Sequence, residues 1–119
     1  MSLSHAVVLI DHHHAQVHQF DAEQSQVKDV KEHQRDTGQH NSAVRTEHEF
    51  FGEVCDALSG IAEVLVTGPH LAQTAFRHYV DKHRPAVSKQ IAGWETVDHP
   101  SEGELVAMGR KFFASTIAK

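Results

Sequence analysis

Residues 61–80, IAEVLVTGPHLAQTAFRHYV, constrain the fold more than any other part of the chain. Residues 64–67 form an unbroken apolar and β-branched run, which is typical of a strand buried on both faces. Gly68 and Pro69 then permit a sharp bend and the start of a helix. Apolar residues return at helical spacing after the bend, namely Leu71, Ala75, Phe76, Tyr79 and Val80. A strand that leads directly into a helix is the basic unit of an α/β domain.

The length of the chain indicates a single domain over residues 1–119, because 119 residues can bury a core of their own and no linker interrupts them. The lone cysteine, Cys55, excludes an internal disulfide bond, and its helical setting favours a buried thiol over a nucleophile. No apolar run approaches the roughly 20 residues of a membrane-spanning helix, and no secretory leader pattern is present. We therefore expect a cytoplasmic protein that has no membrane partner.

The N-terminal segment predicts an antiparallel hairpin and an edge strand. Residues 6–10 are a continuous apolar run, and residues 11–13 can turn the chain into a second strand, where Ala15 and Val17 alternate with polar residues. Residues 25–32 carry lysines and acids, which suit a solvent-facing strand at the sheet edge. A polar loop is expected at about residues 33–44.

Capping signals and prolines delimit the expected helices. Thr46 with Glu49 forms a capping-box pattern before the first apolar helical stripe, and Ser101 with Glu104 forms another before the last. Pro85 ends the helix that follows the central strand.

Between the second and last helices, residues 91–97 read as a further strand with a bulge at Gly93. Strands joined through helices pair in parallel, whereas the leading hairpin is antiparallel. The prediction is an α/β fold, a three-layer α/β/α sandwich around a mixed sheet.

Three runs carry a resemblance to a known family: residues 63–76 (EVLVTGPHLAQTAF), residues 91–113 (IAGWETVDHPSEGELVAMGRKFF) and residues 5–20 (HAVVLIDHHHAQVHQF). Together they resemble small bacterial translational machinery proteins. These are related to the C-terminal domain of the class-one release factor of eukaryotes and archaea and of the ribosome-rescue protein Pelota. The resemblance covers nearly the whole chain. It implies the α/β/α fold and contact with partner proteins, including a translational GTPase.

The same resemblance implies that the chain does not release peptides, because that activity belongs to a separate domain with a Gly-Gly-Gln tip. Gly38-Gln39 lacks the preceding glycine. We therefore expect a non-enzymatic interaction module that binds a ribosome or a translation factor, and we assign no catalytic residue.

Positive residues gather around the end of the second helix and are the expected contacts to an acidic partner or ribosomal RNA: Arg77, His78, Lys82, Arg84 and Lys89. A solvated helix face is the competing interpretation. The net charge of −5 disfavours non-specific binding to nucleic acid. Phe112 and Phe113 lie about 100° apart on a helix, so one of them would suit a partner or a homodimer.

The 12 histidines support a first alternative, a histidine-based metal-binding protein. His12 and His14, or His14 and His18, share a strand face and are candidate ligands for zinc or another divalent ion. A solvated hairpin tip is the competing interpretation. We expect no other cofactor.

A second alternative is a small hydrolase with a ligand or anion site at the carboxyl ends of the strands. Gly68 and His70 begin a helix, whose free N–H groups attract anions, and Asp98 and His99 follow another strand. Tight turns and a helix cap explain the same residues without a ligand.

Overall fold

The computed structural model describes residues 5–11, 13–21, 24–31, 42–97 and 100–114, with the backbone alone for residues 42–45. In chain order the elements are β1 (His5–Ile10), β2 (His14–Phe20), β3 (Ser25–Lys31), α1 (Ser42–Ala57), β4 (Glu63–Gly68), α2 (His70–His83), α3 (Pro85–Gln90), β5 (Ile91–Thr96) and α4 (Glu102–Phe112). No helix in the described part of the chain is long and apolar enough to cross a membrane.

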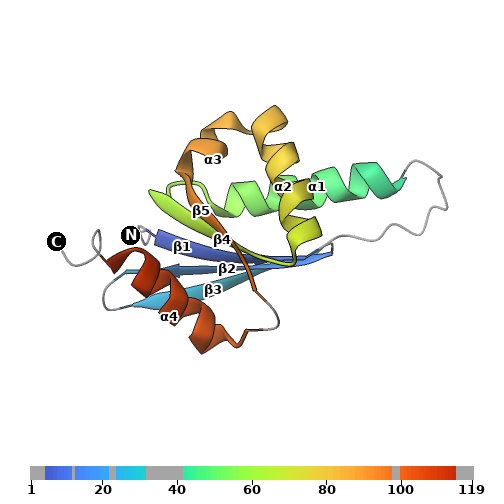
Figure 1. Cartoon of the computed structure of the whole chain (residues 1–119). Helices are drawn as coiled ribbons and strands as arrows, with labels where there is room; N and C mark the ends of the chain where they lie inside the picture. The colour runs from blue at the N-terminus through green and yellow to red at the C-terminus, as the bar shows by residue number, and fades with distance from the viewer. Residues whose placement is uncertain (1–4, 12, 22–23, 32–41, 98–99, 115–119) are drawn as a thin grey trace.

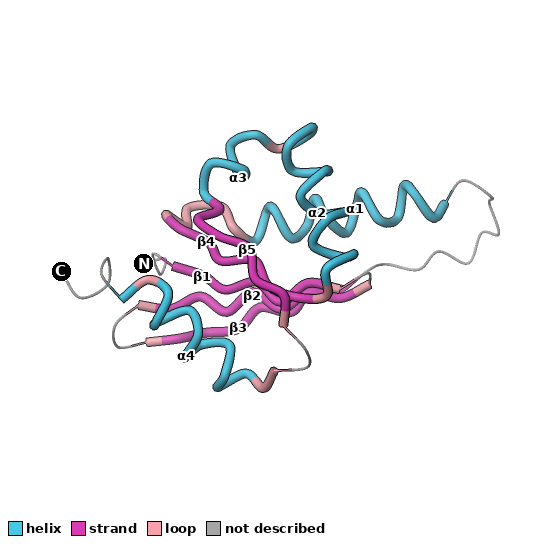
Figure 2. The backbone as a smooth tube through the Cα atoms, in the orientation of Figure 1, coloured by secondary structure: helices cyan, strands magenta, loops and turns pink. Residues whose placement is uncertain are grey.

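The strands form one mixed sheet in the order β3-β2-β1-β4-β5 (Figure 2). β1 pairs antiparallel with β2, and β2 pairs antiparallel with β3. β4 pairs parallel with β1 on one side and with β5 on the other. The structure thus confirms the predicted mixed sheet, with β3 at its edge.

Helices cover both faces of this sheet, as Figure 1 shows: α1, α2 and α3 lie on one face and α4 lies on the other. Because side chains alternate along β1, they belong to two separate hydrophobic cores, one on each face of the sheet. Val8 and its even-numbered neighbours pack with α1, α2 and α3, whereas Val7 packs with Leu105 and Phe113 on the α4 side. The predicted three-layer α/β/α sandwich is confirmed.

Two local interactions fix the direction of the backbone, one in the turn after β1 and one at the end of β4. The Asp11 carboxylate Oδ1 accepts hydrogen bonds from the backbone N–H groups of His13 and His14, each at 2.9 Å, which closes the hairpin turn. Gly68, at the end of β4, has φ of 138° and lies so close to the Ile10 carbonyl that a Cβ would collide with it. Glycine is therefore required at the bend into α2.

The start of α4 carries the predicted capping box. Glu104 N–H donates to Ser101 Oγ at 3.2 Å, and Ser101 N–H donates to Glu104 Oε1 at 3.1 Å. The hydrogen bond from the Ser101 backbone, with a smaller contribution from its hydroxyl, lowers the pKa of the Glu104 carboxyl.

The predicted start of the first helix is wrong. α1 begins at Ser42, so Thr46 is a buried residue within the helix and does not cap it, and residues 42–44 of the expected loop are helical. The apolar helical stripe in the sequence begins only at Phe50, so it does not mark where the helix starts. Residues 33–41 lie outside the described residues.

The bulge in β5 falls one residue before the predicted position. Val64 pairs with Ile91 and Leu65 pairs with Gly93, which leaves Ala92 as the extra residue. Gly93 makes room for Phe112, since a Cβ on Gly93 would lie 2.6 Å from the Phe112 ring. Even so, Phe112 is 41% exposed, while Phe113 is buried, as the angle between them predicted.

Close packing of α4 on the sheet predicts opposite effects for two glycines of this helix. A Cβ on Gly109 would collide with Val7 and lie 2.8 Å from the Phe20 ring, whereas nothing lies within 4 Å of one on Gly103. We expect Gly109→Ala to lower the free energy of unfolding by about 1–3 kcal/mol through overpacking. The control Gly103→Ala should raise it by up to about 1 kcal/mol through helix propensity. Urea unfolding measures both, and equal stabilisation by the two substitutions would contradict the close packing of α4.

Candidate protein-binding surface

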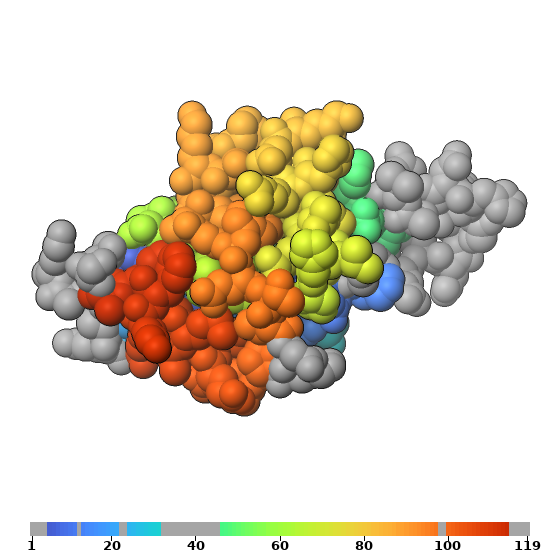
Figure 3. Space-filling model, viewed as in Figure 1, coloured from blue at the N-terminus to red at the C-terminus, as the bar shows by residue number. Residues whose placement is uncertain are grey.

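Helices α1 and α2 line a groove of about 450 Å³. Figure 3 shows α2 at the surface, with only a small part of α1 visible behind it. Three of the groove-lining residues come from α1 and seven from α2: Glu47, His48 and Phe51, then Leu71, Thr74, Ala75, His78, Tyr79, Lys82 and His83. The α2 residues recur every three or four positions, so they form one stripe of the helix. The opposite stripe of α2, through Ala72, Phe76 and Val80, is buried in the core.

Rings from both helices line the groove. The Tyr79 ring lies 5.0 Å from that of His83 and 5.2 Å from that of His48, measured between centroids, and the two imidazoles lie 5.4 Å apart. Phe51 packs against Tyr79 at 5.6 Å beneath them. At the other end of the groove Leu71, which the sequence analysis counted in the apolar stripe, is 70% exposed. Ala72 takes the place of Leu71 in the core.

The five predicted contact residues do not form one patch. His78 and Lys82 line the groove between α1 and α2. The Arg77 guanidinium lies 5.5 Å from the centre of the Trp94 ring on β5, a cation–π contact on another side of α2. Lys89 is exposed on α3.

Arg84 is engaged within the fold. Its Nη1 donates to Asp56 Oδ1 at 3.0 Å and thereby joins the end of α2 to the end of α1. The hydrogen bond to Asp56 is the main cause that raises the pKa of Arg84, and a hydrogen bond with Tyr79 adds to it. Arg84 thus supports the groove wall from outside the groove.

The carboxyl ends of β4 and β5, the predicted ligand or anion site, are joined by Gln73. Its Nε2 donates to the backbone carbonyls of Gly68 at 2.6 Å and Glu95 at 2.7 Å. His70 is exposed at the start of α2. Gly68 has a structural role at the bend into α2, and Asp98 and His99 lie outside the described residues.

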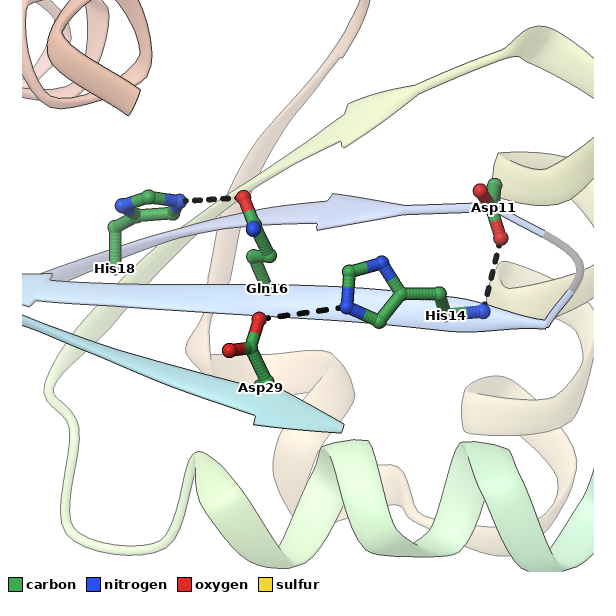
Figure 4. Close-up of polar contacts among 5 residues, drawn as sticks. All are labelled: Asp11, His14, Gln16, His18 and Asp29. Carbon is green, nitrogen blue, oxygen red and sulfur yellow. Dashed lines mark hydrogen bonds and ion pairs between the residues drawn. The ribbon is translucent and has the colours of Figure 1, made fainter. Parts of the chain in front are cut away.

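The predicted histidine ligands on β2 point to different partners, as Figure 4 shows. His14 Nε2 lies 3.3 Å from Asp29 Oδ1, and His18 Nε2 lies 3.2 Å from Gln16 Oε1. Their backbones lie four residue steps apart along β2, about 13 Å, so the two imidazoles do not converge on one point. The described residues contain no group of three or more His, Cys, Asp or Glu side chains that could hold a metal. His12 lies outside the described residues.

His18 is fully buried on the α4 face of the sheet. Burial lowers its pKa, and the carboxylates of Glu102 and Asp29 oppose that shift more weakly. Its Nδ1 has no hydrogen-bond partner within the part of the chain that is described. The neutral imidazole is therefore the form that the fold favours.

Sequence reasoning missed the groove-lining residues His48, Tyr79 and His83 as a group. The signal was present in part, because Leu71, His78 and Lys82 share one helical stripe of α2. The pairing of that stripe with α1 depends on how the two helices cross. This pairing has no local signature in the sequence.

Solved structures of translation termination-like factors share this fold. Pelota of Archaeoglobus fulgidus matches 95% of the chain with a TM-score of 0.63 and 17% identity, and the archaeal termination factor aRF1 matches 85% with a TM-score of 0.61 and 17% identity. Dom34 of S. cerevisiae, described as interacting with Hbs1, matches 97% with a TM-score of 0.60 and 8% identity. The chain spans about a third of each factor, 32%, 32% and 35% of their lengths. No protein-family model and no curated protein sequence matches the chain.

These likenesses establish a fold shared with one part of the termination-like factors, in agreement with the architecture that the sequence resemblance implied.

The buried His18 predicts a loss of stability in mild acid. Its pKa is lower in the folded chain than in the unfolded chain, where histidine titrates near 6.5, so the unfolded state binds the proton more readily. Stability should therefore fall as the pH drops through 6.5 towards the lower pKa of the folded state. We expect His18→Gln to reduce the loss of unfolding free energy between pH 7.5 and 5.5 by about 1 kcal/mol. His78→Gln, at an exposed site on α2, is the matched control, and equal pH profiles for the two variants would contradict the assignment to His18.

The cysteine is buried as predicted, with only 2% of Cys55 exposed. Burial is the main cause that raises the pKa of its thiol to about 11, and Asp56 adds to the shift while Arg84 opposes it. We expect alkylation by iodoacetamide at pH 8 to be at least roughly 100-fold slower in the folded chain than in urea, because the thiolate fraction falls tenfold per pKa unit. Mass spectrometry follows the rate, and similar rates in both states would contradict the burial of Cys55.

Proposed function

We propose that this chain is a non-enzymatic interaction module of the translation apparatus, which docks on a translation factor or on the ribosome. The observation that carries this proposal is the fold, which matches Pelota of Archaeoglobus fulgidus over 95% of the chain. The likeness to Dom34, described as interacting with Hbs1, supports a protein as the partner.

Binding is favoured over catalysis, because the one thiol is buried and a glutamine side chain fills the strand ends. The Cys55 thiol is buried and held in its protonated form. Gln73 occupies the ends of β4 and β5, where ligands of open α/β sheets usually bind. One surface suited to recognition lies on the outer side of α1 and α2, where the groove combines apolar residues with Lys82 and three histidines.

A protein partner is also favoured over ribosomal RNA. Two of the expected RNA contacts are engaged within the fold, because Arg84 pairs with Asp56 and Arg77 lies over Trp94. The net charge of −5 opposes the sequence-independent attraction to phosphates.

Ribosome co-sedimentation tests the proposal. The chain, carrying a small epitope tag and expressed at a low level, is followed through sucrose gradients of native lysate. We expect it in ribosomal or translation-factor fractions, and we expect nuclease treatment of the messenger to leave a contact to a factor intact. A tagged domain of similar size and charge is the control. Absence of the chain from all ribosomal and translation-factor fractions would overturn the proposal.

A further inference from the structure

β5 is an edge strand, and its outer side pairs with no other strand in the described part of the chain (Figure 2). One hydrogen bond fixes the direction of its backbone groups. The Val97 N–H donates to the Gly68 carbonyl at 3.3 Å, so Val97 and, two residues before it, Glu95 turn their backbone groups towards β4. The N–H and carbonyl groups of Trp94 and Thr96 therefore point outward, away from the sheet.

The two edges of the sheet differ in their protection against further pairing. β3, at the opposite edge, carries two lysines and an aspartate, and charged side chains discourage the addition of another strand. β5 contains one charged residue, Glu95, and neither lysine nor proline. The bulge at Ala92 precedes Trp94 and Thr96, so the part of β5 with the outward groups pairs regularly with β4. The β5 edge is thus the more open of the two.

An aromatic side chain lies beside this edge on each face of the sheet. On the α4 face, the Phe112 ring packs against Gly93 and is 41% exposed. On the α2 face, the Arg77 guanidinium lies 5.5 Å from the centre of the half-buried Trp94 ring. Side chains of an added strand point alternately to the two faces, so neighbouring ones would contact Phe112 and Trp94.

The outward backbone groups select an extended segment as the occupant, because a strand satisfies such a row of donors and acceptors together. A second copy of the chain fits poorly. In the antiparallel register that pairs Trp94 with Thr96 of the second copy, Glu95 faces its own counterpart with Cα atoms about 4.5 Å apart. Like charges in this position are destabilising, whereas a lysine or arginine opposite Glu95 is favourable.

We propose that an extended segment of a partner protein adds to the sheet as a further strand, antiparallel to β5. Its backbone forms hydrogen bonds with the N–H and carbonyl groups of Trp94 and Thr96. A lysine or arginine of the segment lies opposite Glu95, and an apolar residue two positions away lies opposite Gly93 and contacts Phe112. The inference rests on the proposed function only for the source of the segment, a protein of the translation apparatus.

Amide hydrogen exchange followed by NMR tests the open edge in the chain alone. We expect the Trp94 and Thr96 amides to exchange at least about tenfold faster than those of Glu95 and Val97, because only the latter two bond to β4. Equal protection of all four amides at low protein concentration would show that the edge is already paired, which overturns the proposal. Protection that appears only at high concentration would make the occupant a second copy and overturn it as well.

Selection from a phage-displayed library of 12-residue linear peptides, with the full chain as target, tests the occupant. We expect enriched peptides to carry lysine or arginine two positions from an apolar residue. Their synthetic copies should slow exchange of the Trp94 and Thr96 amides at least about tenfold. The proposal fails if no peptide is enriched, or if the enriched peptides bind without slowing these two amides.

Two substitutions of Thr96 test the backbone contact. Thr96→Pro removes an outward N–H and leaves the hydrogen bonds to β4 in place, and proline is tolerated on the open side of an edge strand. We expect the affinity, measured by fluorescence anisotropy, to fall about fivefold or more with Thr96→Pro, since one hydrogen bond contributes about 1 kcal/mol. Thr96→Val keeps the N–H and should stay within about twofold of the unaltered chain. Equal affinities of the two variants would contradict strand addition.

An exchange of charges tests the same pairing without a change of backbone. Glu95→Lys should weaken the binding of lysine-bearing peptides at least about threefold, and replacement of that lysine by glutamate in the peptide should restore the affinity. Glu47→Lys, in the groove on α1, is the matched control and should have less than a twofold effect. Equal effects of the two reversals, or no restoration, would refute the predicted register. Circular dichroism checks that each variant folds.

Co-sedimentation of the variants separates this proposal from the proposed function. If Thr96→Pro and Glu95→Lys remain with the ribosomal or factor fractions, strand addition at β5 is not the mode of docking, but the function stands. If peptides bind along β5 while the chain is absent from those fractions, strand addition stands, but the translational role fails.

Discussion

Burial of β1 on both faces is the constraint on which the rest of the structure depends. Its backbone pairs with β2 on one side and β4 on the other, and its side chains alternate between two separate cores. Val7 and Val8, on opposite faces, are fully buried, and each such side chain contributes about 1.5–3 kcal/mol. Helices are therefore required on both sides of the sheet.

The two helical layers meet this requirement differently. Three helices share one face, whereas α4 covers the other and must approach it closely. Gly109 allows that approach, because its missing Cβ leaves room for Val7 and Phe20. The same close cover removes His18 from water, so a histidine becomes part of the core and links the stability of this layer to pH.

One proposed recognition surface lies on the layer of α1 and α2, because only one stripe of α2 is needed to fill the core. α2 uses one stripe, through Phe76 and Val80, to fill the core, and its outer stripe contributes little to the packing of the sheet. Together with α1 this outer stripe forms the groove, whose wall the pair between Arg84 and Asp56 supports. A folded scaffold with a partly apolar, partly polar groove provides a rigid docking surface, which limits the entropy lost on binding.

The sequence by itself determined most of the elements and their layers. The hairpin, the edge strand, the Gly68 bend and the Ser101 cap all depend on neighbours a few residues apart, so local patterns predict them. Tertiary structure alone decided that Leu71 is exposed, that α1 begins before Thr46, and that the five predicted contact residues divide among four surroundings. The physical reason is that periodicity shows which residues share a face of a helix. Which face meets the sheet, and which side chains then meet across two helices, depends on packing between segments far apart in the chain.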